Sequence, residues 1–110
     1  MTDSVLDPSV FTELQATVGE DFAAELLDAF FDEAPGMITA LGDAQAAGDE
    51  DAFRRAAHSI KSNAATFGAT QLADKARVLE MGGIQELALV EALSQDYAQA
   101  AAALQGLKDA

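Results

Sequence analysis

The sequence predicts an all-α protein, an antiparallel up-down four-helix bundle with an additional short N-terminal helix. The composition is rich in Ala, Leu, Glu, Asp and Gln and poor in β-branched runs, which favours helix throughout. Glycines and prolines divide the chain into long helical segments joined by short connections. Short connections between long helices imply antiparallel neighbours. With 110 residues, half of them apolar, we expect residues 1–110 to form a single domain with one core.

The first predicted helix covers residues 8–18 and lies across one end of the bundle. Asp7 followed by Pro8 matches an N-cap before a proline in the first turn, and Gly19 ends the helix.

The second predicted helix covers residues 20–47. Pro35 removes one backbone donor and clashes with the carbonyl of Phe31, so a kink or a break into two helices is required. We expect one kinked helix, with Gly48 as its stop.

Three further helices complete the bundle, over residues 49–67, 70–81 and 84–107. Asp49 is a good N-cap for the third helix, and Gly68 is expected to end it in the left-handed conformation. The last helix carries one apolar stripe, formed by Leu87, Val90, Leu93, Tyr97, Ala101 and Leu104. The expected aromatic core consists of Phe22, Phe30, Phe31, Phe53 and Phe67, with Phe11 as a cap.

The net charge of −13 is unevenly distributed. Residues 1–53 contain thirteen acids and no Lys or Arg, whereas residues 54–79 carry a local charge of +4. Overall acidity argues against nucleic-acid binding, but a local basic segment suits a small anion or one phosphoryl group. Ordinary solvated helix faces remain the alternative explanation. The basic residues concerned are Arg54, Arg55, Lys61, Lys75 and Arg77.

Several protein classes are excluded by composition. Without cysteine and with one histidine, neither a disulfide framework nor a typical zinc site is available. The N-terminus does not match a signal peptide, and no apolar stretch approaches the ~18 residues of a membrane span, so we expect a cytoplasmic protein. No phosphate-binding glycine loop is present, and we expect no cofactor.

The single histidine, His58, is predicted to lie on the outer face of the third helix. Phe53, Ala57, Ile60, Ala64 and Phe67 are spaced as the buried seam of a bundle helix. With Phe53 at zero, His58 lies at about 140° around the helix, away from that seam.

The neighbours of His58 on the helix fit an exposed nucleophile. Lys61 and Arg54 are one turn away on either side, within reach of a negative group on the imidazole. Ser62 and Ala65 are small, which leaves room for a partner to approach the imidazole. An imidazole that carries a phosphoryl group needs exposure, a nearby cation and a group that orients its second nitrogen.

Residues 57–80, AHSIKSNAATFGATQLADKARVLE, resemble the signature of histidine-containing phosphotransfer (HPt) domains. That signature reads roughly A-H-x-L-K-[GS]-x-[AS]-x-x-x-G-A-x-x-L, with Leu-Glu further on. The matching residues are Ala57, His58, Ile60, Lys61, Ser62, Gly68, Ala69, Leu72, Leu79 and Glu80. Ile60 replaces the usual Leu, a conservative change, and the resemblance extends over most of residues 20–81.

The resemblance implies that His58 accepts a phosphoryl group on Nε2 and that Lys61 contacts its oxygens. Glu80 would match the polar residue that hydrogen-bonds to Nδ1 of the histidine. The alternative is that Glu80 is an ordinary solvated acid near the end of its helix. Arg54 and Arg55 become candidates for partner contact together with Ser62 and Ala65, whereas the roles of Lys75 and Arg77 stay open.

The implied function is phosphorelay, with His58 carrying a phosphoryl group between aspartates of response-regulator receiver domains. A sensor or hybrid histidine kinase would be a further partner, the receiver would supply Mg²⁺, and this chain would be a carrier rather than an enzyme. A monomer is expected, and Met1 with its short leader favours a free-standing protein. Two alternatives stay open: a helical module in which His58 is incidental, and a pseudo-HPt that binds a kinase or receiver without carrying phosphate.

Overall fold

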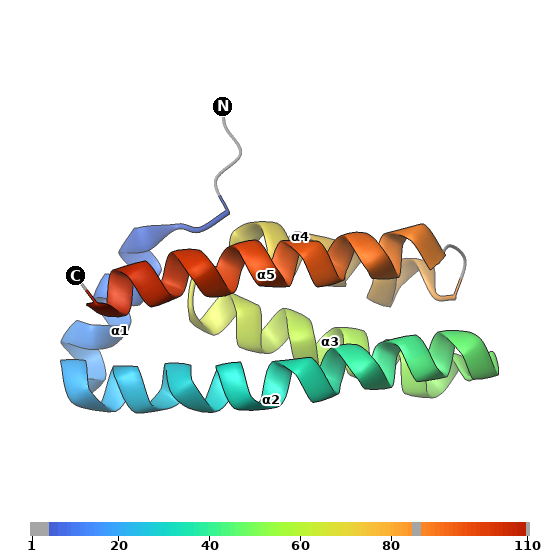
Figure 1. The fold of residues 1–110 in the computed structure, drawn as a ribbon, viewed down its shortest axis with the longest axis horizontal. Helices are drawn as coiled ribbons and strands as arrows, with labels where there is room; N and C mark the ends of the chain where they lie inside the picture. The colour runs from blue at the N-terminus through green and yellow to red at the C-terminus, as the bar shows by residue number, and fades with distance from the viewer. Residues whose placement is uncertain (1–4, 85–86, 110) are drawn as a thin grey trace.

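The computed structural model describes residues 5–84 and 87–109. Within these ranges the chain forms five α-helices and no strand. Figure 1 shows how the helices are arranged. The helices are α1 (Pro8–Val18), α2 (Glu20–Ala47), α3 (Glu50–Thr66), α4 (Thr70–Gly82) and α5 (Leu87–Asp109). The predicted all-α class and the short additional N-terminal helix are confirmed.

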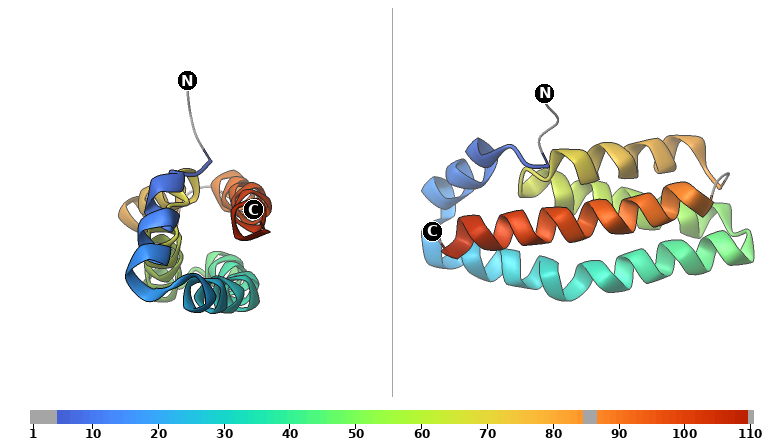
Figure 2. Two further views of the ribbon diagram at one scale, coloured as in Figure 1. Left: turned by 90° about the vertical axis from the view of Figure 1, so that its left-hand side faces the viewer. Right: turned by 45° about the horizontal axis from the view of Figure 1, so that its top comes forward.

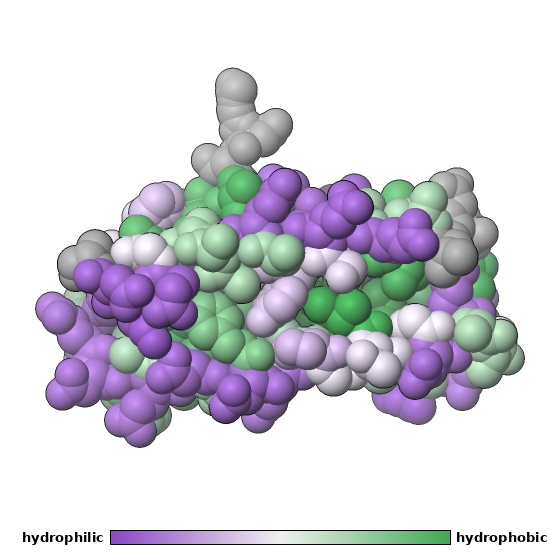
Figure 3. Space-filling model, in the orientation of Figure 1, coloured by the Kyte–Doolittle hydropathy of each residue, from purple (hydrophilic) through white to green (hydrophobic). Residues whose placement is uncertain are grey.

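The four long helices run antiparallel and close into a bundle. Neighbours in sequence pack together from α2 to α5, and α5 returns to contact α2 (Figures 1 and 2). The short α1 packs on α2 at one end of the bundle. Figure 3 shows apolar side chains along the junction of α2 and α5, with hydrophilic side chains over the outer face of α2. None of the described helices combines the length and apolar character that crossing a membrane would require.

The helix boundaries follow the predicted caps. The Asp7 carboxylate accepts a hydrogen bond from the Ser9 backbone N–H at 3.1 Å, and the Asp49 carboxylate accepts one from the Ala52 N–H at 3.1 Å. Both satisfy donors that the first helical turn leaves without intrahelical partners. α2 continues through Pro35 as one helix, and Figure 1 shows its axis changing direction part-way along.

The last helix begins later than predicted. The sequence pattern places its start at residue 84, but residues 85–86 lie outside the described residues and α5 begins at Leu87. At its other end α5 continues to Asp109, two residues past the predicted end at Leu107. Lys108 in this last turn pairs with Asp28 of α2 at 2.8 Å, which holds the end of α5 against α2.

Gly68 joins α3 and α4 to the start of α1. Its φ of 76° confirms the predicted left-handed conformation. A Cβ atom here would lie 2.6 Å from the Asp7 carbonyl oxygen and 2.8 Å from Cβ of Val10. The Asp7 N–H donates to the Gly68 carbonyl at 2.8 Å, so the two segments are in direct backbone contact. Glycine is required both for the backbone conformation and for this close approach.

An aromatic cluster centred on Phe30 fills the middle of the core. The Phe30 side chain stacks on Phe67 at a centroid distance of 5.2 Å and meets Tyr97 edge-on at 5.8 Å. Phe11 and Phe53 are also buried, as predicted. Phe31 is only partly buried.

The prediction that Phe22 lies in the core is wrong, since Phe22 is 50% exposed. The buried positions of this part of α2 are Ala23, Leu27, Phe30 and Ala34. Phe22 precedes Ala23 by one residue and is therefore rotated about 100° away from that stripe.

The buried stripe of α5 differs in part from the predicted one. Val90, Leu93 and Leu104 are buried as expected, while Tyr97 and Ala101 are half-buried. Asp96 and Ala100 are buried in their place. α5 contacts both α4 and α2, so its buried face is wider than a single stripe. The side chain of Leu87 lies outside the described residues.

Candidate functional site

The third helix turns its apolar seam inward and His58 outward, as the sequence predicts. The seam residues Phe53, Ala57, Ile60, Ala64 and Phe67 are all buried. The side chain of His58 is 59% exposed. An amphipathic helix packed against α2 and α4 therefore fixes the backbone of His58 while leaving its imidazole accessible.

The imidazole of His58 is held from α4 by Glu80. Nδ1 of His58 lies 2.9 Å from Oε2 of Glu80, a hydrogen-bond distance. The two residues are 22 positions apart in sequence and are brought together by the packing of α3 against α4. No other hydrogen bond of the His58 side chain occurs within the described part of the chain, so Nε2 faces outward unpaired.

Lys61 completes a three-residue arrangement through the same carboxylate. Its Nζ lies 2.6 Å from Oε1 of Glu80, so each carboxylate oxygen has its own cationic or N–H partner. The Lys61 ammonium has the largest effect and holds the pKa of Glu80 below its ordinary value of 4.5; desolvation opposes it, and the His58 imidazole lowers the pKa further. Glu80 is therefore ionised at neutral pH.

An ionised Glu80 determines which nitrogen of His58 carries the proton. A carboxylate only accepts hydrogen bonds, so the neutral imidazole must donate Nδ1–H to Oε2 of Glu80. The proton is then absent from Nε2, whose lone pair points toward solvent. The arrangement presents a nucleophilic nitrogen whose orientation is fixed from the opposite side of the imidazole.

An open recess of about 430 Å³ adjoins the imidazole. Arg54, Arg55, His58, Ser59 and Glu80 line it. Such a surface accommodates a group presented by another molecule rather than enclosing a small substrate. No set of three His, Cys, Asp or Glu side chains close enough to hold a metal ion occurs in the described ranges.

Comparison with known proteins agrees with this geometry. The family model of the Hpt domain matches residues 25–109, which include α3, α4 and the whole His58 site. The chain belongs to the Hpt domain family. Membership assigns it to histidine phosphotransfer in phosphorelays.

Individual relatives support the same assignment. The phosphorelay protein LuxU of Vibrio harveyi is 32% identical over 80 residues, which cover 73% of this chain and 70% of LuxU. The crystal structure of histidine-containing phosphotransfer protein B (HptB) from Pseudomonas aeruginosa PAO1 superposes with a TM-score of 0.89 at 29% identity. That superposition covers 98% of this chain and 97% of HptB, so it includes the short α1 of the Hpt bundle.

The small residues predicted beside His58 are placed on the surface as expected. Ser62 and Ala65 are exposed on α3, one and two turns beyond His58. Neither carries a long side chain, so the approach to the outer edge of the imidazole is open from this direction.

The predicted basic segment does not form one patch. Arg54 pairs with Glu50 at 3.4 Å, one turn earlier on α3, and its side chain is 53% exposed. Lys75 lines a groove between α4 and α5 instead. Arg77 donates to Sδ of Met81 on its own helix at 3.6 Å. Of the five basic residues, Lys61, Arg54 and Arg55 are beside the imidazole of this Hpt chain.

Sequence reasoning missed two features of the site. Ser59 lines the recess. Because it directly follows His58 in the sequence, its presence at the site could have been predicted. Glu50 holds Arg54 and accepts from the Ile84 N–H at 3.4 Å, linking the start of α3 to the segment after α4. This second contact joins positions 34 residues apart, and no local pattern indicates it.

Proposed function

We propose that His58 carries a phosphoryl group on Nε2 between receiver-domain aspartates of a phosphorelay. The exposed imidazole whose Nδ1–H donates to an ionised Glu80 is the observation that supports this role. The exposure lets a partner's aspartyl phosphate reach Nε2, and the hydrogen bond places the proton of the neutral imidazole on Nδ1, which leaves the Nε2 lone pair free.

The transfer is an in-line displacement at phosphorus. The lone pair of His58 Nε2 attacks the phosphorus of the receiver's aspartyl phosphate, and the Nε2–P bond forms as the bond from phosphorus to the acyl oxygen breaks. The aspartate leaves as a carboxylate with the electron pair of that bond. Positive charge develops on the imidazole, and the adjacent Glu80 carboxylate stabilises it through Nδ1–H. The reverse steps deliver the group to an aspartate of another receiver.

Lys61 stabilises the charge of the phosphoryl oxygens. In the resting protein its ammonium is bound to Oε1 of Glu80, on the Nδ1 side of the imidazole. The flexible lysine side chain reorients toward Nε2 when a phosphoryl group is present, exchanging a carboxylate for the phosphoryl oxygens. The shared carboxylate keeps this cation within reach at all times.

The partner supplies the remaining chemistry. Ser62 and Ala65 form the approach surface, and Arg54 and Arg55 contact the receiver at the rim of the recess. Mg²⁺ belongs to the receiver domain, and the chain itself uses no cofactor. Hpt proteins interact with phosphorelay kinases and receivers as carriers, and this chain would act as a monomer that releases each partner after transfer.

Incubation with a phosphorylated receiver domain tests the proposal. We expect label to move to this chain, to be lost in acid and to survive alkali, as phosphohistidine does. His58→Gln should accept none. If the native chain binds the receiver but acquires no label from any phosphorylated receiver tested, the carrier role is refuted and the pseudo-HPt alternative holds.

A further inference from the structure

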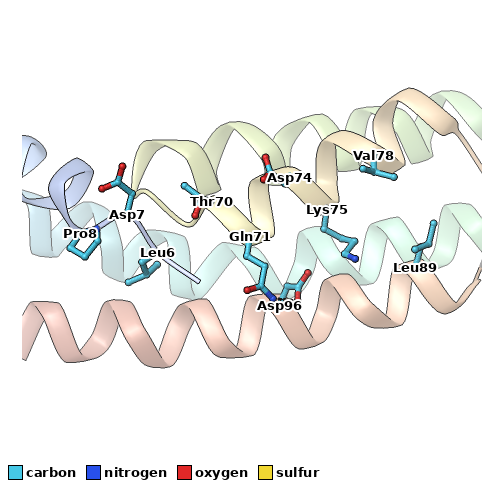
Figure 4. A pocket seen from close by; sticks show the side chains of 10 residues that line it. All are labelled: Leu6, Asp7, Pro8, Thr70, Gln71, Asp74, Lys75, Val78, Leu89 and Asp96. Atoms are coloured by element: carbon cyan, nitrogen blue, oxygen red, sulfur yellow. Dashed lines mark hydrogen bonds between the residues drawn. The ribbon is translucent and has the colours of Figure 1, made fainter. Parts of the chain in front are cut away.

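Two arginines line the recess beside His58, and the structure holds one of them in place. Arg54 and Arg55 are both exposed on α3. Arg54 pairs with Glu50, whereas none of the ion pairs among the described residues involves Arg55. Lys75 lies elsewhere, since Figure 4 shows it extending from α4 toward α5 in the groove between these helices. Arg54 is therefore the recess cation that a partner meets in a defined position.

The carboxylate of Glu50 connects Arg54 to the end of α4. Its Oε1 lies 3.4 Å from Nε of Arg54 and accepts a hydrogen bond from the Ile84 N–H at 3.4 Å. Ile84 directly follows Gly83, the C-cap of α4, and Glu80 lies three residues before that cap. The pair formed by Glu50 and Arg54 thus joins the start of α3 to the helix end that carries Glu80.

Gly83 provides the surface on which both side chains pack. A Cβ atom at this buried glycine would lie 2.6 Å from Oε1 of Glu50 and 3.0 Å from Nη2 of Arg54. The carboxylate and the guanidinium therefore occupy space that any side chain at position 83 would need. An exposed i,i+4 ion pair alone contributes little. Confinement against Gly83 and the contact with Ile84 distinguish Arg54 from an ordinary surface arginine.

The position of the guanidinium indicates what it binds. Arg54 and Glu50 lie about 6 Å and 12 Å before His58 along the helix axis, at 1.5 Å per residue. A guanidinium held toward Glu50 lies to the side of a phosphoryl group on Nε2. It donates no hydrogen bond to another described residue, so its N–H groups are available to a partner. The planar arginine side chain matches a carboxylate, which it binds with two parallel hydrogen bonds.

We propose that Glu50 is a positioning residue for partner recognition, which holds Arg54 at the rim of the recess so that its guanidinium binds a carboxylate on the surface of the receiver domain. This inference rests on the proposed function, in which Arg54 contacts the receiver. A guanidinium that is already ordered avoids the cost of immobilising a long side chain on binding, which corresponds to roughly three- to tenfold in affinity. The negative charge of Glu50 has the opposite effect, since it repels an approaching carboxylate.

The test is a double-mutant cycle on receiver binding, measured by calorimetry. The probe is a receiver domain with Mg²⁺ and beryllium fluoride, which replaces its phosphoryl group and cannot be transferred. Arg54→Ala should weaken binding at least tenfold. Glu50→Ala should weaken it roughly three- to tenfold in the native chain and not at all in the Arg54→Ala variant. Asp51→Ala, the same loss of charge in the same turn of α3, should not weaken binding.

Two conservative variants separate the reach of Glu50 from its charge. Glu50→Asp keeps the charge, but its side chain is one methylene too short for both contacts, so it should bind the receiver as weakly as Glu50→Ala. Glu50→Gln keeps an acceptor oxygen at the same distance and should restore most of the affinity. In transfer from the phosphorylated receiver, Glu50→Asp should raise KM and leave kcat unchanged, because the phosphoryl position is not altered.

Each contrary result overturns the proposal. Equal losses from Glu50→Ala with and without Arg54 would show that Glu50 acts on the start of α3 and not through Arg54. Native affinity in Glu50→Asp together with a loss in Glu50→Gln would show that charge alone matters. Absence of binding to every receiver tested overturns the proposal as well. Circular dichroism of each variant excludes unfolding as the cause. If the chain binds a receiver but takes up no label on His58, the carrier role fails while the binding cycle still decides the role of Glu50.

Discussion

At the scale of single residues, one carboxylate organises the His58 site. Glu80 accepts a hydrogen bond from Nδ1 of His58 with one oxygen and forms an ion pair with Nζ of Lys61 through the other. The Glu80 carboxylate therefore fixes the imidazole tautomer and holds the Lys61 ammonium close to the imidazole. Because Lys61 lowers the pKa of Glu80 from its ordinary value of 4.5, this acceptor is ionised throughout the pH range in which an ordinary histidine is neutral.

Glu80→Gln is expected to slow phosphotransfer by about 10- to 100-fold, because a glutamine amide can donate to Nδ1 as well as accept from it. Both tautomers then become populated, and one of them has a protonated Nε2. The ¹⁵N shifts of the imidazole report the tautomer directly, since the chain has one histidine. An unchanged Nδ1–H tautomer together with an unchanged rate would refute the orienting role; Glu25→Gln, an exposed acid on α2, is the control.

Lys61→Ala is expected to slow transfer on the order of 10²-fold, as the loss of one charge-stabilising donor does in other sites. The free energy of unfolding should fall by only about 0–1 kcal/mol, because a partly exposed ion pair contributes little stability. Single-turnover transfer and urea unfolding measure the two effects separately. Losses of equal size in both, when expressed as free energies, would assign Lys61 a structural role.

The three residues themselves were predictable from sequence, but their connection was not. The helical position of His58 relative to the buried seam was sufficient to place its side chain outside, and the HPt resemblance identified Lys61 and Glu80. The ion pair between Lys61 and Glu80 depends on how α3 and α4 pack across the bundle. The same packing places Lys75 in the groove between α4 and α5. This separation could not be predicted from the sequence, because Lys75 is close in sequence to Arg77 and Glu80.

At the scale of helices, the site depends on α3 being fixed at both ends and open along one face. Asp49 caps its start, and the segment at Gly68 anchors its end against α1. These boundaries were predictable because caps and helix-ending glycines are local signals. The contact of Gly68 with Asp7 and Val10 was not, since it depends on where α1 returns to the bundle.

Gly68→Ala is expected to destabilise the protein more than Gly48→Ala. Both glycines have positive φ, 76° and 69°, so each substitution costs about 1–2 kcal/mol for the left-handed conformation. Only at Gly68 would the added Cβ also meet a backbone oxygen at 2.6 Å, whereas nothing lies within 4 Å at Gly48. Urea unfolding measures the free energy of unfolding of both variants. Equal decreases would show that the contact between Gly68 and the start of α1 can adjust to a Cβ atom without loss of stability.

Ser62→Gln should block phosphotransfer from a receiver while leaving the fold intact, because Ser62 is exposed on the face of α3 that a partner must approach. The longer side chain would cover the outer edge of the imidazole. Ser94→Gln, an equally exposed serine on α5, is the matched control. Transfer at the native rate in Ser62→Gln would show that partners approach from another direction.

At the scale of the whole molecule, the bundle is held together where helices distant in sequence meet. Phe30 of α2 contacts Phe67 at the end of α3 and Tyr97 of α5. The apolar patterns predicted which helices exist and most of their inward faces. They could not predict that α5 faces two neighbours at once, which buries Asp96 and Ala100 beside the expected stripe.

Phe30→Ala is expected to lower the free energy of unfolding by about 3–5 kcal/mol, the usual cost of deleting a buried phenylalanine. Phe22→Ala should cost about 0.5 kcal/mol or less, because that side chain is 50% exposed. Thermal and urea unfolding of both variants provide the comparison. A similar cost for the two would mean that Phe22 packs more closely in solution than its exposed fraction implies.

In a carrier that holds its phosphoryl group on His58, the 59% exposure of this side chain would also limit how long a signal is stored. A phosphoryl group on Nε2 would be open to water as well as to a receiver, so hydrolysis competes with delivery from the moment of loading. The lifetime of the loaded carrier is then governed by the P–N bond itself and by how abundant the acceptor is. Faithful relay would require a plentiful acceptor, because an unshielded imidazole offers no protection of its own.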